Sequence, residues 1–201
     1  MNSLVTYTLR IADDSLILGQ RLSEWCGYGP ILEEDIAMTN IALDLIGQAT
    51  SLLEYAGSVE KAGRSADDLA FLRYEHDYKN VLLTEQPNGD FAHTMVRQWL
   101  FDTFRLFFYD ALCHSKDKHL AAIAEKSLKE TRYHCKHSSE WVIRMGDGTE
   151  ESHERAQKAL NTLWRYADEL FFMDETDQEL IAKGIAVDLE ALTPLGQALL
   201  P

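Results

Sequence analysis

The chain has 201 residues, of which 46% are hydrophobic, enough for a single domain over residues 1–201 with one sizeable core. Its formal net charge is −14. A strongly acidic chain repels phosphate backbones, so we expect no nucleic-acid partner. Glycine (11) and proline (4) are scarce, and no proline interrupts a long periodic segment, which favours helices over a β fold rich in turns.

The cysteines and the N-terminal sequence predict a cytoplasmic protein. Cys26, Cys113 and Cys135 lie far apart and form no CxxC pair, which fits a reducing compartment. Residues 1–14 lack a basic region followed by a long apolar run, so they do not read as a signal peptide. No stretch reads as apolar enough to span a membrane, and we therefore expect no membrane association.

Hydrophobic residues recur at spacings of three and four along several long segments, which is the period of a helix. Short breakers such as Gly-Pro at 29–30 and Pro-Asn-Gly at 87–89 separate these segments. The pattern predicts helices over 6–25, 31–55, 66–83, 91–114, 118–145 and 150–172, and irregular chain over 184–201. Antiparallel helices of this length with short loops predict an all-α fold, an up-down helical bundle with additional helices.

The second of these segments is the least charged. Between Ile36 and Leu53 its only charged residue is Asp44, so we expect a central, buried helix. Asn40, Asp44 and Gln48 are four residues apart and form one polar stripe. Two interpretations remain open. In the first, the stripe faces a wet crevice or makes hydrogen bonds between helices. In the second, the Asp44 carboxylate points at a cation or a metal, because burying a carboxylate without a partner costs free energy.

The sequence contains part of the ligand set of a di-iron carboxylate site. Such a site takes one Glu from each of two helices and a Glu-x-x-His motif from each of the other two. Glu24, near the end of the first helix, can serve as the first Glu, and Asp44 lies on the second helix. The residue three positions after Asp44 is Gly47, which has no side chain to bind a metal.

The later helices leave the set incomplete. Asp102 lies on the fourth helix, where Arg97 and Arg105 are available to pair with it. On the fifth helix His134 follows Glu130 by four residues instead of three, although both fall on or beside the inward stripe. A histidine near an apolar face is more often a hydrogen-bonded core residue than a ligand. The candidates for a vestigial metal site are therefore Glu24, Asp44, Glu130 and His134.

Outside this set the residues predict surface or core rather than chemistry. The sequence has no GxSxG, P-loop, GxGxxG or HExxH motif. The remaining histidines with polar neighbours read as surface: His76, His114, His119, His137 and His153. A short basic strip on the fifth helix is either a solvated face or a docking site for an acidic partner or anionic ligand; it consists of Lys129, Arg132, Lys136 and His137.

Several longer motifs, taken in order, resemble a known family. They are LGQRLSEWCG at 18–27, GPILEEDIA at 29–37, NIALDLIGQA at 40–49, EQPNGDFA at 85–92, KETRYH at 129–134 and LWR at 163–165. Together they resemble the C-type subunits of the bacterial phenylacetyl-CoA epoxidases, and the resemblance covers essentially the whole chain. This chain ends before the C-terminal segment usual in such subunits, so we expect a truncated variant.

The resemblance implies a multicomponent oxygenase of phenylacetate catabolism. Its catalytic A-type subunit holds a di-iron centre and epoxidises the ring of phenylacetyl-CoA with molecular oxygen, and a reductase delivers electrons from NADPH. The C-type subunit is a ferritin-like relative without the metal site that pairs with the A-type subunit in a hetero-oligomer. For this chain the resemblance therefore implies a structural subunit with no catalytic residue and no cofactor of its own.

Four hypotheses follow. The leading one is this non-catalytic scaffold; the alternative is a di-iron oxygenase in its own right, with a variant metal site at Glu24, Asp44, Glu130 and His134. Iron storage is a third, weakened because it also needs a carboxylate-rich site, and an unrelated helical interaction module is a fourth. If the site is vestigial, we expect Asp44, Glu130 and His134 to be hydrogen-bonded to each other or to arginines, because buried charges need partners.

Overall fold

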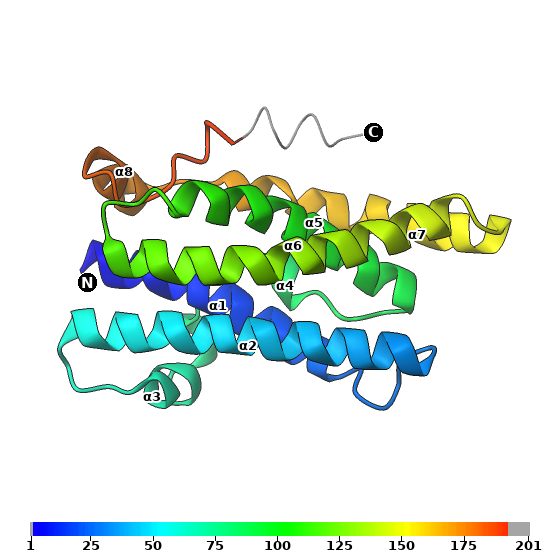
Figure 1. Cartoon of the computed structure of the whole chain (residues 1–201), viewed down its shortest axis with the longest axis horizontal. Coiled ribbons are helices and arrows are strands. Elements are labelled where there is room, and N and C mark those ends of the chain that lie inside the picture. The colour runs from blue at the N-terminus through cyan, green and yellow to red at the C-terminus, as the bar shows by residue number, and fades with distance from the viewer. Residues whose placement is uncertain (1, 193–201) are drawn as a thin grey trace.

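The computed structural model describes residues 2–192, which contain eight α-helices, three short 3₁₀ helices and no strand (Figure 1). The helices are α1 (Ser3–Ser23), α2 (Leu32–Glu60), α3 (Ala66–Phe71), η1 (Glu75–Asp77), α4 (Leu82–Glu85), α5 (Phe91–Leu112), α6 (Lys118–Gly146), α7 (Glu150–Leu163), η2 (Trp164–Tyr166), η3 (Asp168–Phe171) and α8 (Glu175–Ala182). The predicted all-α fold, a ferritin-like helical bundle with additional helices, is confirmed.

The bundle consists of two long helical hairpins, α1–α2 and α5–α6 (Figure 1). Within each hairpin the backbones pack closely, whereas α2 and α6 approach each other less extensively. Helix α7 packs along α5 and α6, and α8 packs against α1. The hairpins are therefore compact units, and side chains that reach across between them decide how they fit together.

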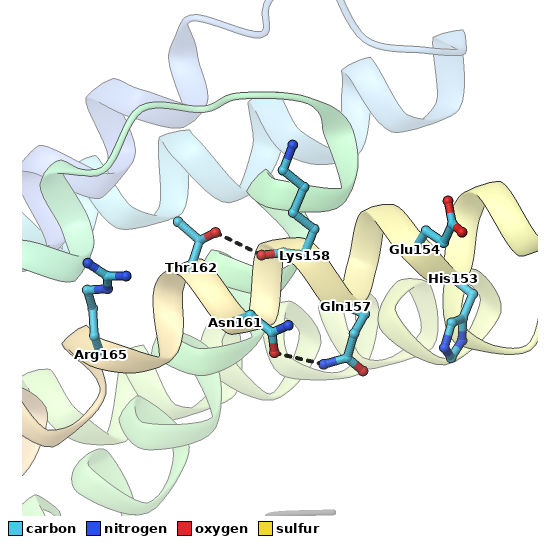
Figure 2. Close-up of a pocket in the computed structure, with 7 residues that line it drawn as sticks. All are labelled: His153, Glu154, Gln157, Lys158, Asn161, Thr162 and Arg165. Carbon is cyan, nitrogen blue, oxygen red and sulfur yellow. Dashed lines mark hydrogen bonds between the residues drawn. The ribbon is translucent and has the colours of Figure 1, made fainter.

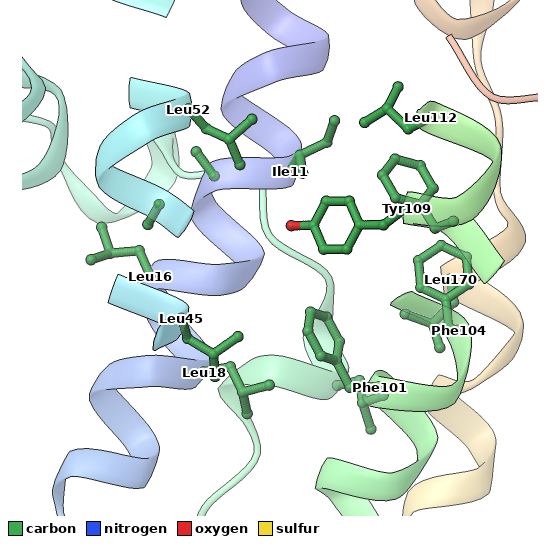
Figure 3. Close-up of a cluster of buried hydrophobic side chains, with 14 of the residues drawn as sticks. Ile11, Leu16, Leu18, Leu45, Leu52, Phe101, Phe104, Tyr109, Leu112 and Leu170 are labelled. Carbon is green, nitrogen blue, oxygen red and sulfur yellow. The ribbon is translucent and has the colours of Figure 1, made fainter. Parts of the chain in front are cut away.

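The core lies where these helices meet. Figure 3 shows Ile11 and Leu18 of α1, Leu45 of α2 and Phe101 of α5 converging on one apolar cluster, with Leu170 of η3 beside α5. All five side chains are buried. Truncating such a leucine to alanine costs about 2–5 kcal/mol of stability, because the surrounding side chains fill the cavity only in part.

Capping side chains fix where the long helices begin. Asp90 accepts a hydrogen bond from the His93 amide at the start of α5 (2.9 Å), and Asp117 accepts from the Leu120 amide at the start of α6 (3.0 Å). Each bond satisfies an amide that has no partner within its own helix. Asp90 follows directly after the Pro-Asn-Gly breaker at 87–89, and both helices begin at the residues that the sequence predicts.

The prediction of one helix over 66–83 is wrong. The chain leaves the helix after α3 because Arg73 turns inward and forms a buried ion pair with Asp13 of α1, and its Nη1 lies 2.9 Å from Asp13 Oδ2. The amides of Lys79 and Val81 then donate to the carboxylates of Asp13 (2.9 Å) and Asp14 (2.8 Å). These bonds direct the backbone of this segment to α1 instead of to its own helical carbonyls.

The prediction of a helix over 150–172 is right for α7 but too long. From Leu163 the chain continues in two 3₁₀ turns, whose tighter winding keeps Ala167 and Leu170 buried. Phe171 then contacts Phe104 of α5, with ring centroids 5.5 Å apart. Residues 184–192 contain turns without a helix, as predicted, and the remainder of the predicted irregular tail, 193–201, lies outside the described residues.

The expectation that no segment is apolar enough to span a membrane is wrong for α2. By length and composition α2 passes that test, as core helices of water-soluble bundles also do. In this structure α2 packs along α1 over most of its length, and its inward side contributes Ile41, Leu45 and Leu52 to the core. The apolar composition of α2 is therefore explained on its inner side by burial in the bundle.

Candidate functional site

Two of the four candidate metal-site residues meet between α2 and α6. Nε2 of His134 lies 3.0 Å from Oδ2 of Asp44, so that the imidazole donates to the carboxylate. His134 is buried, whereas the Asp44 side chain is 39% exposed. The expectation that these two residues bond to each other is confirmed, and their pairing joins the two hairpins.

Burial decides the charge state of this histidine. The pKa of His134 is lowered, chiefly by desolvation of the imidazole, although the Asp44 carboxylate and Glu130 act in the opposite direction. Because the ordinary pKa of histidine is 6.5, a lowered pKa means that the ring is mostly neutral at pH 7. The Asp44–His134 contact is therefore a hydrogen bond from a neutral ring to a carboxylate at that pH.

Glu130 bonds to a neutral side chain instead of to an arginine. Nε2 of Gln48 donates to its Oε2 at 2.9 Å, and Lys126 lies 3.8 Å from its other oxygen. The Tyr109 hydroxyl of α5 donates to Oε1 of Gln48 at 3.2 Å. In Figure 3 the ring of Tyr109 extends from α5 into the core. The polar stripe of α2 thus makes hydrogen bonds between helices, which is one of the two interpretations that the sequence left open.

Glu24 lies apart from the other three candidates. It is exposed and follows the last turn of α1, where its carboxylate accepts hydrogen bonds from Arg21 (3.0 Å) and from the side chain of Asn88 (3.0 Å). Its partners are therefore on α1 and on the loop before α5. The structure gives Glu24 a role in holding this loop.

The donor set between α2 and α6 does not fit a di-iron centre. His134 Nε2 and Glu130 Oε2 are both engaged in hydrogen bonds within the protein. At Gly47, where the sequence places the missing histidine, a Cβ atom would meet nothing within 4 Å, so a side chain at this position would enter open space on the outer side of α2. In the part of the chain that the structure describes, no group of three or more His, Cys, Asp or Glu side chains is placed to hold a metal ion.

Asp102 has different partners from those that the sequence offered. Neither Arg97 nor Arg105 pairs with it; instead Gln98 Nε2 donates to Oδ1 at 2.7 Å, and Ser138 Oγ of α6 lies 2.9 Å from Oδ2. The carboxyl group is completely buried, and its pKa is raised to about 8 by desolvation, which outweighs the two hydrogen bonds.

These contacts accommodate a protonated carboxyl group. At pH 7 a group with this pKa is mostly neutral, so the Asp102 O–H can donate to Ser138 Oγ. The Ser138 hydroxyl then donates to the carbonyl of His134, 3.0 Å away. Gln98 supplies the remaining donor. Asp102 therefore links α5 to the backbone turn of α6 that carries His134, without placing a charge in the core.

The two arginines near Asp102 bind elsewhere because they point away from α6. Arg97 donates to the carbonyl of Gln86 and to Oδ1 of Asn88 (2.7 Å), and so holds the loop before its own helix. Burial lowers the pKa of Arg97 to about 10, which still leaves it charged. Arg105 pairs with Asp14 of α1 at 2.9 Å and also donates to the Ile11 carbonyl.

His137 is not a surface residue as predicted. It is mostly buried, and its Nε2 lies 2.8 Å from Oε2 of Glu34, near the start of α2. The sequence gave no signal for this contact, because both residues have charged neighbours along the chain. With Asp44–His134 and Gln48–Glu130, it makes a row of polar contacts between α2 and α6.

A shallow crevice along α7 is lined by polar residues (Figure 2). They are His153, Glu154, Gln157, Lys158, Asn161, Thr162 and Arg165, all of them exposed. Two of the contacts drawn in Figure 2 lie within α7 itself, from Gln157 to Asn161 and from Thr162 to the Lys158 carbonyl. The crevice is therefore a solvated helix face without a buried group aimed into it.

Comparison with known proteins agrees with this geometry. The family model described as "Phenylacetic acid catabolic protein" matches residues 1–196. The chain belongs to this family. A relative in the phenylacetic acid catabolic protein family is the C-type subunit of the 1,2-phenylacetyl-CoA epoxidase of Escherichia coli (strain K12), which is 48% identical over 198 residues, covering 98% of this chain and 79% of the relative. The family resemblance predicted from the motifs is confirmed.

Proposed function

We propose that this chain is the non-catalytic structural subunit of a phenylacetyl-CoA epoxidase, and that it pairs in the cytoplasm with a di-iron catalytic subunit. The observation that carries the proposal is its 48% identity, over 98% of its length, to the C-type subunit of the E. coli epoxidase. In this proposal the partner binds the metal and performs the oxidation, a reductase supplies the partner with electrons, and this chain shapes and stabilises the assembly.

The geometry between α2 and α6 supports a structural role. At the position where a di-iron protein of this architecture places carboxylates and imidazoles, this chain has hydrogen bonds from His134 to Asp44 and from Gln48 to Glu130. Such bonds satisfy each buried polar group without an ion. These bonds hold the two hairpins in a fixed position relative to each other. A subunit whose role is to present a surface to its partner requires such a fixed arrangement.

The test is co-expression with the catalytic subunit encoded in the same genome. We expect a stable complex on gel filtration, iron in stoichiometric amount only when the catalytic subunit is present, and turnover of phenylacetyl-CoA only with that subunit and a reductase. Failure of the two chains to co-purify would leave an unrelated interaction module as the better explanation.

The alternative, an oxygenase in its own right, rests on Asp44, Glu130 and His134 as ligands. It predicts about two iron ions per chain when this protein is expressed alone in iron-supplemented medium. It also predicts that a Glu130→Ala, His134→Ala double variant loses that iron. Iron content near zero in the wild-type chain, unchanged in the double variant, is the result that we expect.

A further inference from the structure

The outer side of α2 is apolar and uncovered. Between the first turn of the helix and its middle, the exposed large side chains are Leu32, Ile36 and Leu43, and Leu43 is 62% exposed. Only 44% of the residues in the most apolar stretch of α2 are buried. Burial in the bundle therefore explains one side of this helix, and nothing within residues 2–192 explains the apolar composition of the other side.

The exposed apolar side chains lie in a strip along one side of α2, with the exposed, uncharged Asn40 between Ile36 and Leu43. Leu32, Ile36 and Leu43 project from one side of α2, and Gly47 follows at the next turn, where a Cβ atom would meet nothing. From Leu32 to Gly47 the strip is about 22 Å long at 1.5 Å per residue. The only charge between Ile36 and Leu53 is Asp44, which is already bonded to His134.

The N-terminal end of this strip is held rigidly. The amides of Gly27 and Gly29 both donate to Oδ2 of Asp35 in α2, at 2.8 and 3.0 Å. A Cβ atom on Gly29 would lie 2.7 Å from Asp35, so only glycine allows this close turn. Tyr28, at the tip of the turn, is 79% exposed. A large aromatic side chain on a preorganised turn is typical of an interface anchor.

Helix α6 adds an aromatic residue and positive charge beside the strip. Tyr133 is half-exposed, and it neighbours His134 and His137, the two histidines that face α2. Lys129 and Lys136 lie four and three residues from Tyr133, and so on the same face of α6. Helix α6 carries six Lys and Arg residues against three Glu, in a chain whose net charge is −14.

We propose that the α2–α6 face, formed by Tyr28, Leu32, Ile36, Leu43, Gly47 and Tyr133 and bordered by Lys129 and Lys136, is the docking surface for the catalytic partner. The inference rests on the proposed function. Its occupant is a helical face with an apolar stripe that is flanked by carboxylates, because this is the surface that complements both the strip and the lysines.

The size of the face fits such a partner. Helices α2 and α6 have 29 residues each, and Figure 1 shows them side by side and antiparallel. Each is about 44 Å long, and two neighbouring helices are roughly 20 Å wide, so their whole outer side presents about 900 Å², of which the 22 Å apolar strip covers about half. A stable interface takes about 800 Å² from each partner.

A second copy of this chain complements the face poorly. In a two-fold dimer the same patch serves both protomers, so the lysines of α6 would have to find carboxylates on the face itself. Along the strip, α2 carries the carboxylates of Glu33, Glu34, Asp35 and Asp44. Glu34 is bonded to His137, Asp35 to the 27–29 turn and Asp44 to His134, which leaves the exposed Glu33, among the described residues of this part of α2, to meet the lysines of a second copy. The charge of the face therefore favours a different, more acidic surface.

The test measures binding of the purified chain to the catalytic subunit. In Leu43→Asp a carboxylate replaces the centre of the strip, and we expect the affinity to fall about 100-fold. The matched control is Leu72→Asp: Leu72 is 75% exposed and lies outside the α2–α6 face, so its affinity should be unchanged. Circular dichroism and thermal unfolding of both variants show whether each is folded.

A second pair of variants tests the charge. Lys129→Glu with Lys136→Glu should weaken binding about tenfold at low salt and less at high salt, because added ions screen the interaction. Lys158→Glu on α7 is the control for net charge and should bind as the wild-type chain does.

The possible outcomes separate the two proposals. If the wild-type chain does not bind the catalytic subunit at all, the proposed function fails. If Leu43→Asp binds the catalytic subunit as tightly as the wild-type chain does, the function stands and this surface is wrong. If Leu43→Asp instead dissociates a dimer of this chain, the face is a self-association surface and the inference is overturned.

Discussion

Helix α5 buries ionisable groups on two sides in two different ways. Towards α1, Arg105 forms an ion pair with Asp14 and lies over the rings of Phe101 and Phe108, 4.9 and 5.2 Å from their centroids. Towards α6, Asp102 has only Gln98 and Ser138 as partners. The first side keeps two opposite charges together, whereas the second removes the charge by protonation.

Asp14 and Asp102 are both buried, so the difference in their charge state comes from their partners and not from the depth of burial. Burial raises the pKa of Asp14 to about 6, although Arg105 and the Val81 amide lower it. Without a cation, burial raises the pKa of Asp102 further, to about 8. Asp14 is therefore ionised at pH 7 and accepts a hydrogen bond from the Val81 amide, whereas Asp102 is mostly neutral and serves as a hydrogen-bonding group.

Removing the cation should have the largest effect. In Arg105→Met the Asp14 carboxylate loses its buried partner, and we expect the free energy of unfolding at pH 7 to fall by about 3–5 kcal/mol. Urea denaturation measures this. An Asp14→Asn, Arg105→Met double variant should recover part of the loss, because it leaves no uncompensated charge. A loss below about 1 kcal/mol in the single variant would mean that Asp14 is as neutral as Asp102.

The second prediction concerns the pH dependence that Asp102 imposes. Its pKa is about 8 in the folded chain and near the ordinary value of 3.8 when unfolded, so the folded state binds more protons between these pH values. Stability contributed by this group is therefore complete below pH 4 and lost as pH rises towards 8, with a slope of at most about 1.4 kcal/mol per pH unit.

The variant Asp102→Asn should remove this slope. Its amide can bond to both Gln98 and Ser138 and does not titrate, so unfolding measured from pH 5 to 8 should show a flatter profile than that of the wild-type chain. At pH 8 the variant should be the more stable of the two. If the two profiles are parallel, Asp102 has the same pKa in the folded and the unfolded chain, and the free-energy cost of burying it is offset in another way.

The contact between His134 and Asp44 is intermediate between the Asp14–Arg105 ion pair and the neutral Asp102, because it joins a carboxylate to a mostly neutral ring. The pKa of His134 is lowered, so the folded chain binds fewer protons, and the stability from this group is lost as pH falls below the unfolded pKa near 6.5. Asp44→Asn should lower the pKa further, because Asp44 raises it. A ¹H–¹⁵N NMR titration measures both values. A pKa of His134 above 6.5 in the wild-type chain would mean that this contact is an ion pair, like that of Asp14 with Arg105.

The smallest expected effect is at Gly47. Because α2 is helical there and a Cβ atom meets nothing, Gly47→Ala should stabilise the isolated chain by about 0.5–1 kcal/mol in thermal unfolding. The control is Gly57→Ala in the same helix, where the new Cβ atom would lie 2.5 Å from the Arg64 carbonyl and should destabilise the chain. Equal effects at both positions would show that the outer side of α2 is covered in the isolated chain.

The candidate site was predictable only in part. The expectation of the Asp44–His134 contact followed from the polar stripe that carries Asp44 and the inward stripe beside His134, which the spacing in the sequence gives directly. Glu24 was assigned to the site because it is a glutamate near the end of the first helix, but its carboxylate turns to Arg21 and Asn88. The partners of Asp102 were not predictable, since one of them, Ser138, lies 36 residues away on another helix.

Hydrophobic periodicity, capping residues and the family motifs are local properties of the chain, so the fold class, the family and the long helices could be predicted from the sequence. Where the chain departs from those helices, and which buried groups carry charge, depends on contacts between segments that are far apart in the sequence. The break after α3 depends on Asp13, 60 residues before Arg73. The charge of each buried carboxyl group depends on whether a neighbouring helix brings a cation to it, as α5 brings Arg105 to Asp14 but no cation to Asp102.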